Sequence, residues 1–383
     1  MKVAIVTATR AEYGILYPLI EKLSNDSVID LQLLVTGTHL SKKYGNTQNE
    51  ILNDGFTIFK KYPILTDGNS SLDTSLIMAN ALINFAHYFE EEKPACVIIL
   101  GDRTEMLGIS AAAVDSGIPI VHLHGGELTE GAIDDSIRHA ITKLAYLHFP
   151  STEEYRKRII QMGETPDRVF NVGALGVENI LNIEYIGKKE LFSELNIPYD
   201  KKIVVVTFHP VTLENGQEKA QVKELIKAMK LRDSYFYLIT KANSDAGGDI
   251  VNNMFEEYVK ISPNSKLVSS LGMKRYLSAV KYSEFVLGNS SSGIIEAPSI
   301  GTPTVNIGDR QKGRIMAESV INCEPICEEI LKAIDKASVC THVASYIYGD
   351  GNTSSKILKI IKETFNKEDF DGRKKFYDVK FGG

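Results

Sequence analysis

The sequence predicts an α/β protein made of two Rossmann-like, doubly wound domains with a cleft between them. Short β-branched apolar runs, typical of buried parallel strands, alternate with segments of helical periodicity. The same alternation starts again near residue 200, after a charged segment without such runs. The length of 383 residues is too great for one ordinary core and suits two domains.

The first domain is expected over residues 1–176 and carries the acid/base candidates. Buried strands are predicted in KVAIVTAT, LQLLVTG, ACVIILGD and IPIVHLHGG. Helices are predicted in YGILYPLIEKLSN, SLIMANALINFAHYFEEEKP, EMLGISAAAVDSG, DSIRHAITKLAYLHF and TEEYRKRIIQMG, and VFNVGALG closes the domain. Strands that alternate with helices in this order indicate a parallel, doubly wound sheet.

The second domain is expected over residues 177–355. The junction segment VENILNIEYIGKKELFSELNIPYDKK carries no buried-strand run. Strands follow in KKIVVVTFHP, YFYLIT, KLVSS, FVLGNSS and TPTVNIGD, with helices in EKAQVKELIKAM and GDIVNNMFEEYVKI. Residues 356–383, an amphipathic helix and a polar tail, are expected to pack back on the first domain. In such folds ligands bind beyond the carboxyl ends of the strands.

Composition excludes several classes of protein. A net charge of −6 argues against nucleic-acid binding. No apolar run reaches the roughly 18 residues that span a bilayer, so no membrane partner is expected. The start MKVAIVTATRAEYG lacks the long apolar region of a secretory signal, and the four cysteines lack metal-ligand spacing. We therefore expect a cytoplasmic protein with reduced thiols and no metal.

Three charged residues follow predicted strands of the first domain. Arg10 lies between the first strand and its helix, where side chains and free backbone N–H groups can face an anion. Asp102 directly follows the strand ACVIIL and could be a general base or could order the turn. Arg103 comes next and is placed among the nucleotide-binding candidates.

The stretch IVHLHGGELTEGAIDDSIRH is unusually rich in ionisable groups. His122 and His124 alternate on a predicted strand and would share a face, but no second cluster supplies a third metal ligand. Glu127 follows the Gly-Gly turn, and Asp134 lies near a helix start, where aspartate often caps. These carboxylates and Asp102 exceed what capping needs. Packed together they would perturb one another's pKa values, as acid/base catalysis requires.

The second domain supplies candidates for binding an anionic ligand. His209 ends the strand of KKIVVVTFHP, and Asn243 lies in a polar loop after YFYLIT that could also be a simple turn. In GNSSSGIIEAPSIG, serine hydroxyls are expected at the start of a helix, an arrangement that binds anions. The candidates here are Ser290, Ser291 and Ser292, with Glu296 two turns in and within reach of a ribose, followed by Arg310 and Arg314. Several cations with such a loop would hold a diphosphate.

Taken together, the chain resembles the hydrolysing UDP-N-acetylglucosamine 2-epimerases of sialic acid biosynthesis. The matching segments are TATRAEYG, VTGTHL, ILGDRTE, HLHGGE, IDDSIRHAITK, STEEY, FHPVT, GNSSSGIIEAPS and NIGDRQKGR, in order over residues 1 to about 315. The resemblance implies a fold of the GT-B glycosyltransferase type without metal or cofactor, and a homodimer or homotetramer. It implies conversion of UDP-N-acetylglucosamine and water to N-acetylmannosamine and UDP through a glycal.

The resemblance also implies roles for the candidates. UDP would be held by Arg10, Arg103, His209, Asn243, the serines, Glu296, Arg310 and Arg314, and proton transfer would fall to Asp102, Glu127, Asp134, His124 and His209. Many relatives have HIEGGE, with a glutamate where this chain has His124. Either His124 or Glu127 would take over that glutamate's role.

The substitution at His124 also leaves the substrate open. A related branch acts on UDP-N,N′-diacetylbacillosamine for legionaminic acid synthesis, and the motifs do not separate the two sugars. A glycosyltransferase of the same fold and a non-enzymatic two-lobed binder are the alternatives from other classes.

Overall fold

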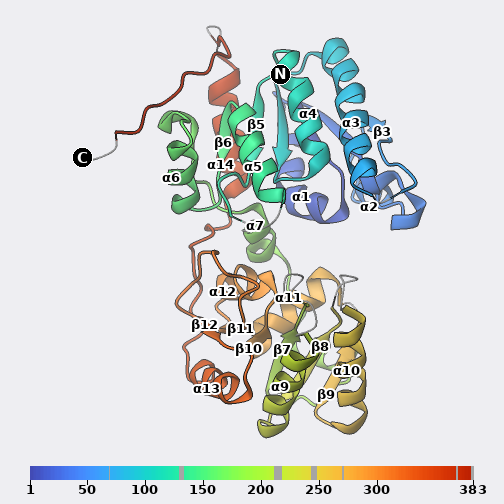
Figure 1. Ribbon diagram of the computed structural model, residues 1–383, viewed down its shortest axis with the longest axis vertical. Coiled ribbons are helices and arrows are strands. Elements are labelled where there is room, and N and C mark those ends of the chain that lie inside the picture. Colours follow the sequence, from blue (N-terminus) through green and yellow to red (C-terminus); the bar gives the residue numbers. More distant parts are fainter. Residues whose placement is uncertain are drawn as a thin grey trace. The chain divides into compact units, whose positions relative to one another are not determined.

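The computed structural model describes residues 1–68, 70–128, 133–210, 218–242, 248–269, 271–367 and 370–380 (Figure 1). The chain forms two compact units. Unit 1 combines Met1–Asn179 with Tyr348–Gly383, and unit 2 is Ile180–Ile347. The chain therefore leaves unit 1, builds unit 2, and returns to complete unit 1.

Unit 1 is built on a six-stranded sheet of order β3-β2-β1-β4-β5-β6, in which every neighbouring pair is parallel. The strands are β1 (Lys2–Thr7), β2 (Asp30–Thr36), β3 (Lys60–Tyr62), β4 (Cys96–Leu100), β5 (Ile120–Leu123) and β6 (Leu147–Phe149). The order reverses at β1, between β2 and β4, which is the switch point of a doubly wound sheet.

Helices cover both faces of this sheet. They are α1 (Arg10–Ser24), α2 (Gln48–Asn53), α3 (Ser71–Glu92), α4 (Thr104–Asp115), α5 (Ile133–Leu144), α6 (Glu153–Gln161), α7 (Leu175–Asn182, which crosses the unit boundary) and α14 (Thr353–Phe365). Alternate residues of β1 face opposite layers: Val3 and Ile5 pack with α1 and α14, whereas Ala4 and Val6 pack with α3, α4 and α5. This double burial explains the continuous apolar run of the strand.

Unit 2 repeats the plan with a parallel sheet of order β12-β11-β10-β7-β8-β9. The strands are β7 (Ile203–Thr207), β8 (Phe236–Thr240), β9 (Ser265–Val268), β10 (Ser283–Gly288), β11 (Thr304–Ile307) and β12 (Val320–Cys323). The helices are α8 (Lys188–Glu194), α9 (Glu218–Leu231), α10 (Gly248–Ile261), α11 (Gly272–Tyr282), α12 (Glu296–Ile300) and α13 (Cys327–Ala337). Two doubly wound α/β units are thus confirmed.

Some predicted elements have different limits. The helix expected through Phe149 ends at Leu144, because β6 begins at Leu147 and pairs with β5. The segment VFNVGALG adds no strand to the sheet: it forms a single bridge from Val169 to His148, and its last two residues begin α7. The short strands β3 and β12, and the helix α13, were not predicted.

The carboxyl-terminal segment belongs to unit 1. Ile357, Ile361 and Phe365 of α14 join the core that contains Leu16 and Leu19 of α1. Residues 370–380 form no helix or strand, and Tyr377 N donates to Gly163 O at 3.0 Å. Within the described ranges, no helix combines the length and the apolar character needed to cross a membrane.

Candidate functional site

The acidic candidates Glu127 and Asp134 lie in electrostatic reach of Asp102, just beyond the carboxyl end of β4. Gly101 turns the chain with a φ of +72°, and Asp102 forms a salt bridge with Arg138 of α5. The side chain of Arg138 is 7% exposed. Burial raises the pKa of Asp102, Arg138 lowers it, and the charges of Asp134 and Glu127 raise it. The net pKa is raised, so Asp102 holds a proton more readily than an ordinary aspartate.

His124 and Glu127 form a pair on the loop after β5. His124 Nδ1 lies 3.2 Å from Glu127 Oε1, and Ser151 Oγ donates to the same oxygen at 3.1 Å. His124 lies beyond the strand with a φ of +60°, a left-handed conformation that is uncommon outside glycine. The prediction that His122 and His124 share a strand face is therefore wrong, because β5 ends at Leu123.

His122 supports the site from within the core. It is fully buried, its Nε2 donates to Gly101 O at 2.8 Å, and its Nδ1 lies 3.1 Å from Thr142 Oγ1. Burial lowers the pKa of His122 to about 3, so the ring stays neutral. His122 thus joins the Asp102 loop to α5. In the described part of the chain no cluster of three or more His, Cys, Asp or Glu is arranged to hold a metal ion.

The two arginines of unit 1 that were predicted to bind nucleotide have acidic partners. Arg10 Nε lies 3.0 Å from Glu50 Oε2, and the Arg10 side chain is 71% exposed. Arg103 Nε donates to Glu105 Oε1 at 2.6 Å. Glu12, which the sequence analysis did not single out, is buried beside Arg103, and burial raises its pKa to about 7.

In unit 2 the loops after β7 and β10 are joined by one asparagine. Asn289 Oδ1 accepts from His209 N at 2.7 Å, and Asn289 Nδ2 donates to His209 O at 2.8 Å. Because β7 and β10 are neighbours in the sheet, the two hydrogen bonds fix His209 beside the serine loop. His209 is 7% exposed. Asn289 was not predicted to belong to the site, although it directly follows strand β10, the position by which the other candidates were identified.

The serine loop differs from the predicted helix start. Ser291–Gly293 form a single 3-10 turn, and α12 begins only at Glu296 and has five residues. The expectation that Glu296 lies two turns into a helix is therefore wrong. Ser290 Oγ accepts from Ser292 N at 3.3 Å, and Tyr276 OH donates to Ser292 Oγ at 2.9 Å. The loop presents hydroxyls, without the dipole of a long helix.

Two arginines reach this loop from the segment after β11. Arg310 Nη1 and Gln311 Nε2 donate to Asn289 O at 3.2 and 2.9 Å. Burial raises the pKa of Glu296, while a hydrogen bond from Ser292 and the charge of Arg314 lower it, so Arg314 lies in electrostatic reach of Glu296. Unit 2 thus brings together His209, Ser290, Ser291, Ser292, Glu296, Arg310 and Arg314. Asn243 lies outside the described residues.

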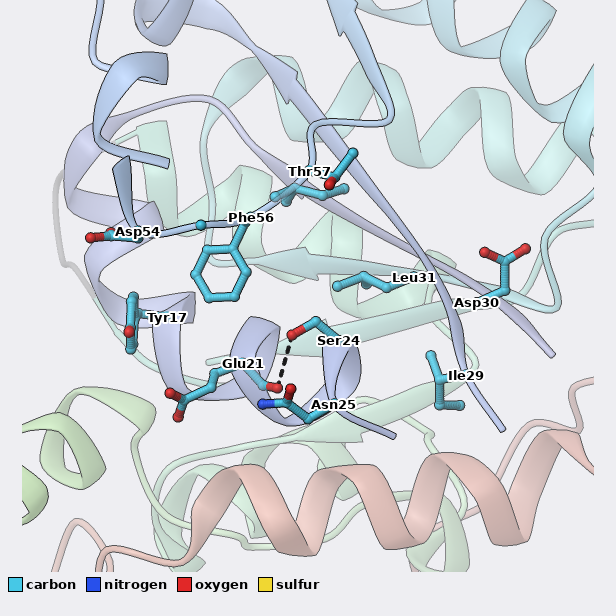
Figure 2. A pocket seen from close by; sticks show the side chains of 12 residues that line it. Tyr17, Glu21, Ser24, Asn25, Ile29, Asp30, Leu31, Asp54, Phe56 and Thr57 are labelled. Atoms are coloured by element: carbon cyan, nitrogen blue, oxygen red, sulfur yellow. Dashed lines mark hydrogen bonds between the residues drawn. The ribbon is translucent and has the colours of Figure 1, made fainter. Parts of the chain in front are cut away.

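A hollow of about 520 Å³ on unit 1 contains none of the predicted site residues (Figure 2). It lies where the end of α1 meets the start of β2 and residues 54–57. Tyr17, Asp54 and Phe56 line it, and Ser24 Oγ donates to Glu21 O at 3.0 Å on its floor (Figure 2). The start of a strand is the end opposite to that where doubly wound sheets bind ligands.

Comparison with known proteins gives consistent matches along the chain. Residues 21–362 match a family model described as UDP-N-acetylglucosamine 2-epimerase. A GDP/UDP-N,N′-diacetylbacillosamine 2-epimerase (hydrolyzing) of Campylobacter jejuni subsp. jejuni is 43% identical over 84% of this chain and 84% of its own. The polysialic acid biosynthesis protein P7 of Escherichia coli is 38% identical over 99% and 97% of the two chains.

A solved structure agrees with the fold. The UDP-GlcNAc 2-epimerase from Neisseria meningitidis bound to UDP-GlcNAc superposes with a TM-score of 0.79 at 20% identity, over 95% of this chain and all of that one.

Proposed function

Because the chain belongs to the UDP-N-acetylglucosamine 2-epimerase family, whose related members are hydrolysing enzymes of UDP-sugars, we propose that it hydrolyses a UDP-2-acetamido sugar with inversion at C2. Membership in this family favours an epimerase over the two alternatives that the sequence left open, a glycosyltransferase of the same fold and a non-enzymatic two-lobed binder. The observation that carries the proposal is the group of acidic side chains at the end of β4. Arg138 pairs with Asp102 and donates to the backbone O of Glu127, and burial with the charges of Asp134 and Glu127 raises the pKa of Asp102.

The chemistry requires two proton transfers at C2. Removal of the C2 proton and departure of UDP from C1 give a glycal. Water then adds at C1 while C2 receives a proton on the opposite face. Two transfers on opposite faces need two differently placed acid/base groups near neutral pH. Unit 1 supplies these groups in Asp102, Asp134 and the His124–Glu127 pair.

Departure of UDP places negative charge on a diphosphate. Arg310 and Arg314, with the hydroxyls of Ser290–Ser292, are the groups of unit 2 that would stabilise this charge. Arg10 and Arg103 are the cationic candidates of unit 1, and each would have to exchange its glutamate partner for phosphate. Glu296 would accept from the ribose.

The favoured sugar is N,N′-diacetylbacillosamine, supported by the names of relatives at 43% and 36% identity in Campylobacter and Legionella. UDP-N-acetylglucosamine, the substrate expected from the sequence, is the second candidate. It is supported by the polysialic acid protein at 38% and by a Neisseria meningitidis epimerase at 28%. The Campylobacter relative's name includes GDP as well as UDP, so the nucleotide also needs a test.

The test is incubation of the protein with each sugar nucleotide in deuterated water. The UDP and GDP forms of N,N′-diacetylbacillosamine and UDP-N-acetylglucosamine are compared without any acceptor. We expect free nucleotide and a free sugar that carries deuterium at C2. Nucleotide release without deuterium at C2 would indicate simple hydrolysis and contradict the proposal.

We also expect a homodimer or homotetramer that works in the cytoplasm. The outward face of α3 supports self-association, because Leu72, Leu76 and Ile83 are 66%, 44% and 55% exposed there. All four cysteines are unpaired, as in a reducing compartment.

The role of the α3 face in self-association can be tested by light scattering. The natural chain should give a multiple of 42.4 kDa, and Ile83→Glu should give a smaller mass. Equal masses would contradict a role of this face.

A further inference from the structure

His124 and Glu127 lie side by side at the end of β5, and the family resemblance leaves their roles open. His124 occupies the position at which many relatives have glutamate. Its backbone is held in the left-handed region with a φ of +60°, and its N donates to Phe149 O at 3.1 Å. This conformation is unfavourable for a non-glycine residue. The strained residue directly follows the end of β5 at Leu123.

Glu127 is fixed by groups from three elements. Its Oε1 accepts from Ser151 Oγ at 3.1 Å, and its backbone O accepts from Arg138 Nη1 of α5 at 2.9 Å. Arg158 of α6 donates to the neighbouring Gly126 O. The carboxylate is therefore held in place beside His124 Nδ1, at 3.2 Å.

This contact determines which nitrogen of His124 is available. A carboxylate only accepts, so the 3.2 Å separation favours the tautomer with its proton on Nδ1, which leaves the lone pair on Nε2. Nε2 is buried and has no hydrogen-bond partner in the described part of the structure. A buried ring nitrogen without a partner is unfavourable, and its presence points to a partner that arrives with the substrate.

We propose that His124 is a catalytic residue that exchanges the C2 proton through Nε2, and that Glu127 and Ser151 are positioning residues that orient its ring. This inference rests on the proposed epimerase function. It assigns to the imidazole the part played by glutamate in many relatives, and to Glu127 the orienting role of a carboxylate behind a catalytic histidine.

The proton and electron balance is as follows. Neutral His124 takes the C2 proton at Nε2, the C–H electron pair becomes the C1–C2 double bond, and the C1–O pair leaves with the nucleotide. The imidazolium is stabilised by Glu127 and later loses its proton to solvent. A carboxyl group on the opposite face, from Asp102 or Asp134, donates to C2 as the water oxygen bonds to C1. The proton that water loses restores that carboxyl.

Other charged groups lie on the elements next to the His124–Glu127 loop. Asp102 follows β4, Asp134, Asp135 and Arg138 lie on α5, Arg158 lies on α6, and neutral His122 lies on β5. Arg138 is paired with Asp102 and lies 3.5 Å from Asp135, so these charges offset one another in part. Among the described residues, Glu127 is the carboxylate in direct contact with the His124 ring.

The experiment compares His124→Ala, His124→Glu, Glu127→Gln and Ser151→Ala with Glu363→Gln, an exposed change on α14, as matched control. Nucleotide release is measured from pH 5 to 9. We expect His124→Ala to lower kcat by about 100-fold or more with a smaller change in KM. His124→Glu should restore part of the turnover and move the acid limb of the profile to lower pH, because carboxylates titrate below imidazoles.

Glu127→Gln separates an orienting role from a catalytic one. Glutamine removes the carboxylate that orients the His124 ring, so kcat should fall while KM changes little. Ser151→Ala should act in the same direction by a smaller amount. ¹⁵N NMR of labelled histidine should show the proton of His124 on Nδ1 in the natural protein, independently of activity.

These results distinguish failure of the proposed His124 role from failure of the proposed epimerase function. Turnover of His124→Ala above a tenth of the natural value, or a kcat that Glu127→Gln leaves unchanged, would overturn the inference while leaving the epimerase function intact. An Nε2-protonated His124 would overturn it as well. A natural protein that releases nucleotide from none of the sugars would instead refute the proposed function, and with it the catalytic role of His124.

Discussion

Replacement of Lys374 by methionine should destabilise unit 1, because this lysine ties the carboxyl-terminal segment to a buried carboxylate. Glu164 has a side chain only 2% exposed and is contacted by Lys143 Nζ at 2.6 Å, Lys374 Nζ at 2.9 Å and His148 Nε2 at 3.1 Å. Lys374 Nζ also donates to the backbone oxygens of Lys143 and Ala145 at 2.7 and 2.6 Å. Methionine preserves the length of the side chain and removes all three interactions.

The magnitude follows from these contacts. Burial alone would raise the pKa of Glu164, but hydrogen bonds from His148, Lys143 and Lys374 lower it to about 2 from an ordinary 4.5. That difference corresponds to about 3 kcal/mol of unfolding free energy, present above pH 4.5 and lost as the pH falls toward 2. Lys374 supplies one of three donors, about 1 kcal/mol of this. Its loss also leaves two carbonyls without that donor, so Lys374→Met should cost about 2 kcal/mol at pH 7.

The assay is urea unfolding at pH 7 followed by far-UV circular dichroism, since the chain has no tryptophan. Hydrogen exchange of β6 and α6 reports unit 1 separately, with β7 of unit 2 as internal reference. Lys375→Met, an exposed neighbour, is the matched control. The same change in a Glu164→Gln background should cost about 1 kcal/mol less, because the charge that Lys374 compensates is absent.

A cost below about 0.5 kcal/mol for Lys374→Met would refute the reasoning, since surface substitutions fall within that range. An equal cost in the presence and absence of the Glu164 charge would refute the electrostatic part alone.

Three further predictions concern the site and its support. Asp102→Asn should lower kcat by about 100-fold or more with an unchanged circular dichroism spectrum, and turnover within tenfold of the natural value would remove Asp102 from the catalytic set. Burial raises the pKa of Glu12 to about 7, so its ionisation destabilises the fold progressively between pH 4.5 and 7. Relative to the natural chain, Glu12→Gln should therefore gain about 2 kcal/mol from pH 5 to pH 8, and a constant difference in urea titrations would contradict this. Gly288 has a φ of +141°, and a Cβ there would meet Thr207 O, so Gly288→Ala should lower the melting temperature and weaken UDP binding measured by calorimetry. Unchanged values of both would show that the strand end tolerates the side chain.

The strands with long apolar runs were predictable, because burial on both faces leaves a clear pattern. β1 and β7 are examples, and their alternate residues pack on opposite layers. β6 was not predictable, because its three residues follow α5 closely and continue the same apolar pattern. The edge strand β12 has only one buried residue, Val320, and gives no such run.

The candidate site was predictable where chemistry-bearing residues directly follow such strands. Asp102, His209 and Ser290 were identified by this rule, and they lie at those strand ends. Ser151 and Gln311 were missed because their contacts depend on which loops are neighbours in the sheet. The left-handed backbone of His124 was missed as well, because a non-glycine residue gives no local signal of a positive φ.

The split of unit 1 into two chain segments has a consequence for synthesis on the ribosome. A nascent chain that has emerged to residue 347 contains every strand of both sheets, but it lacks α14, whose Ile357, Ile361 and Phe365 complete a core layer of unit 1. Unit 2 is therefore the first to possess all its residues, although its synthesis starts later. Until α14 has been synthesised, the apolar side of α1 that it covers is exposed to other nascent chains. A chaperone that binds exposed apolar surface would act mainly in this interval.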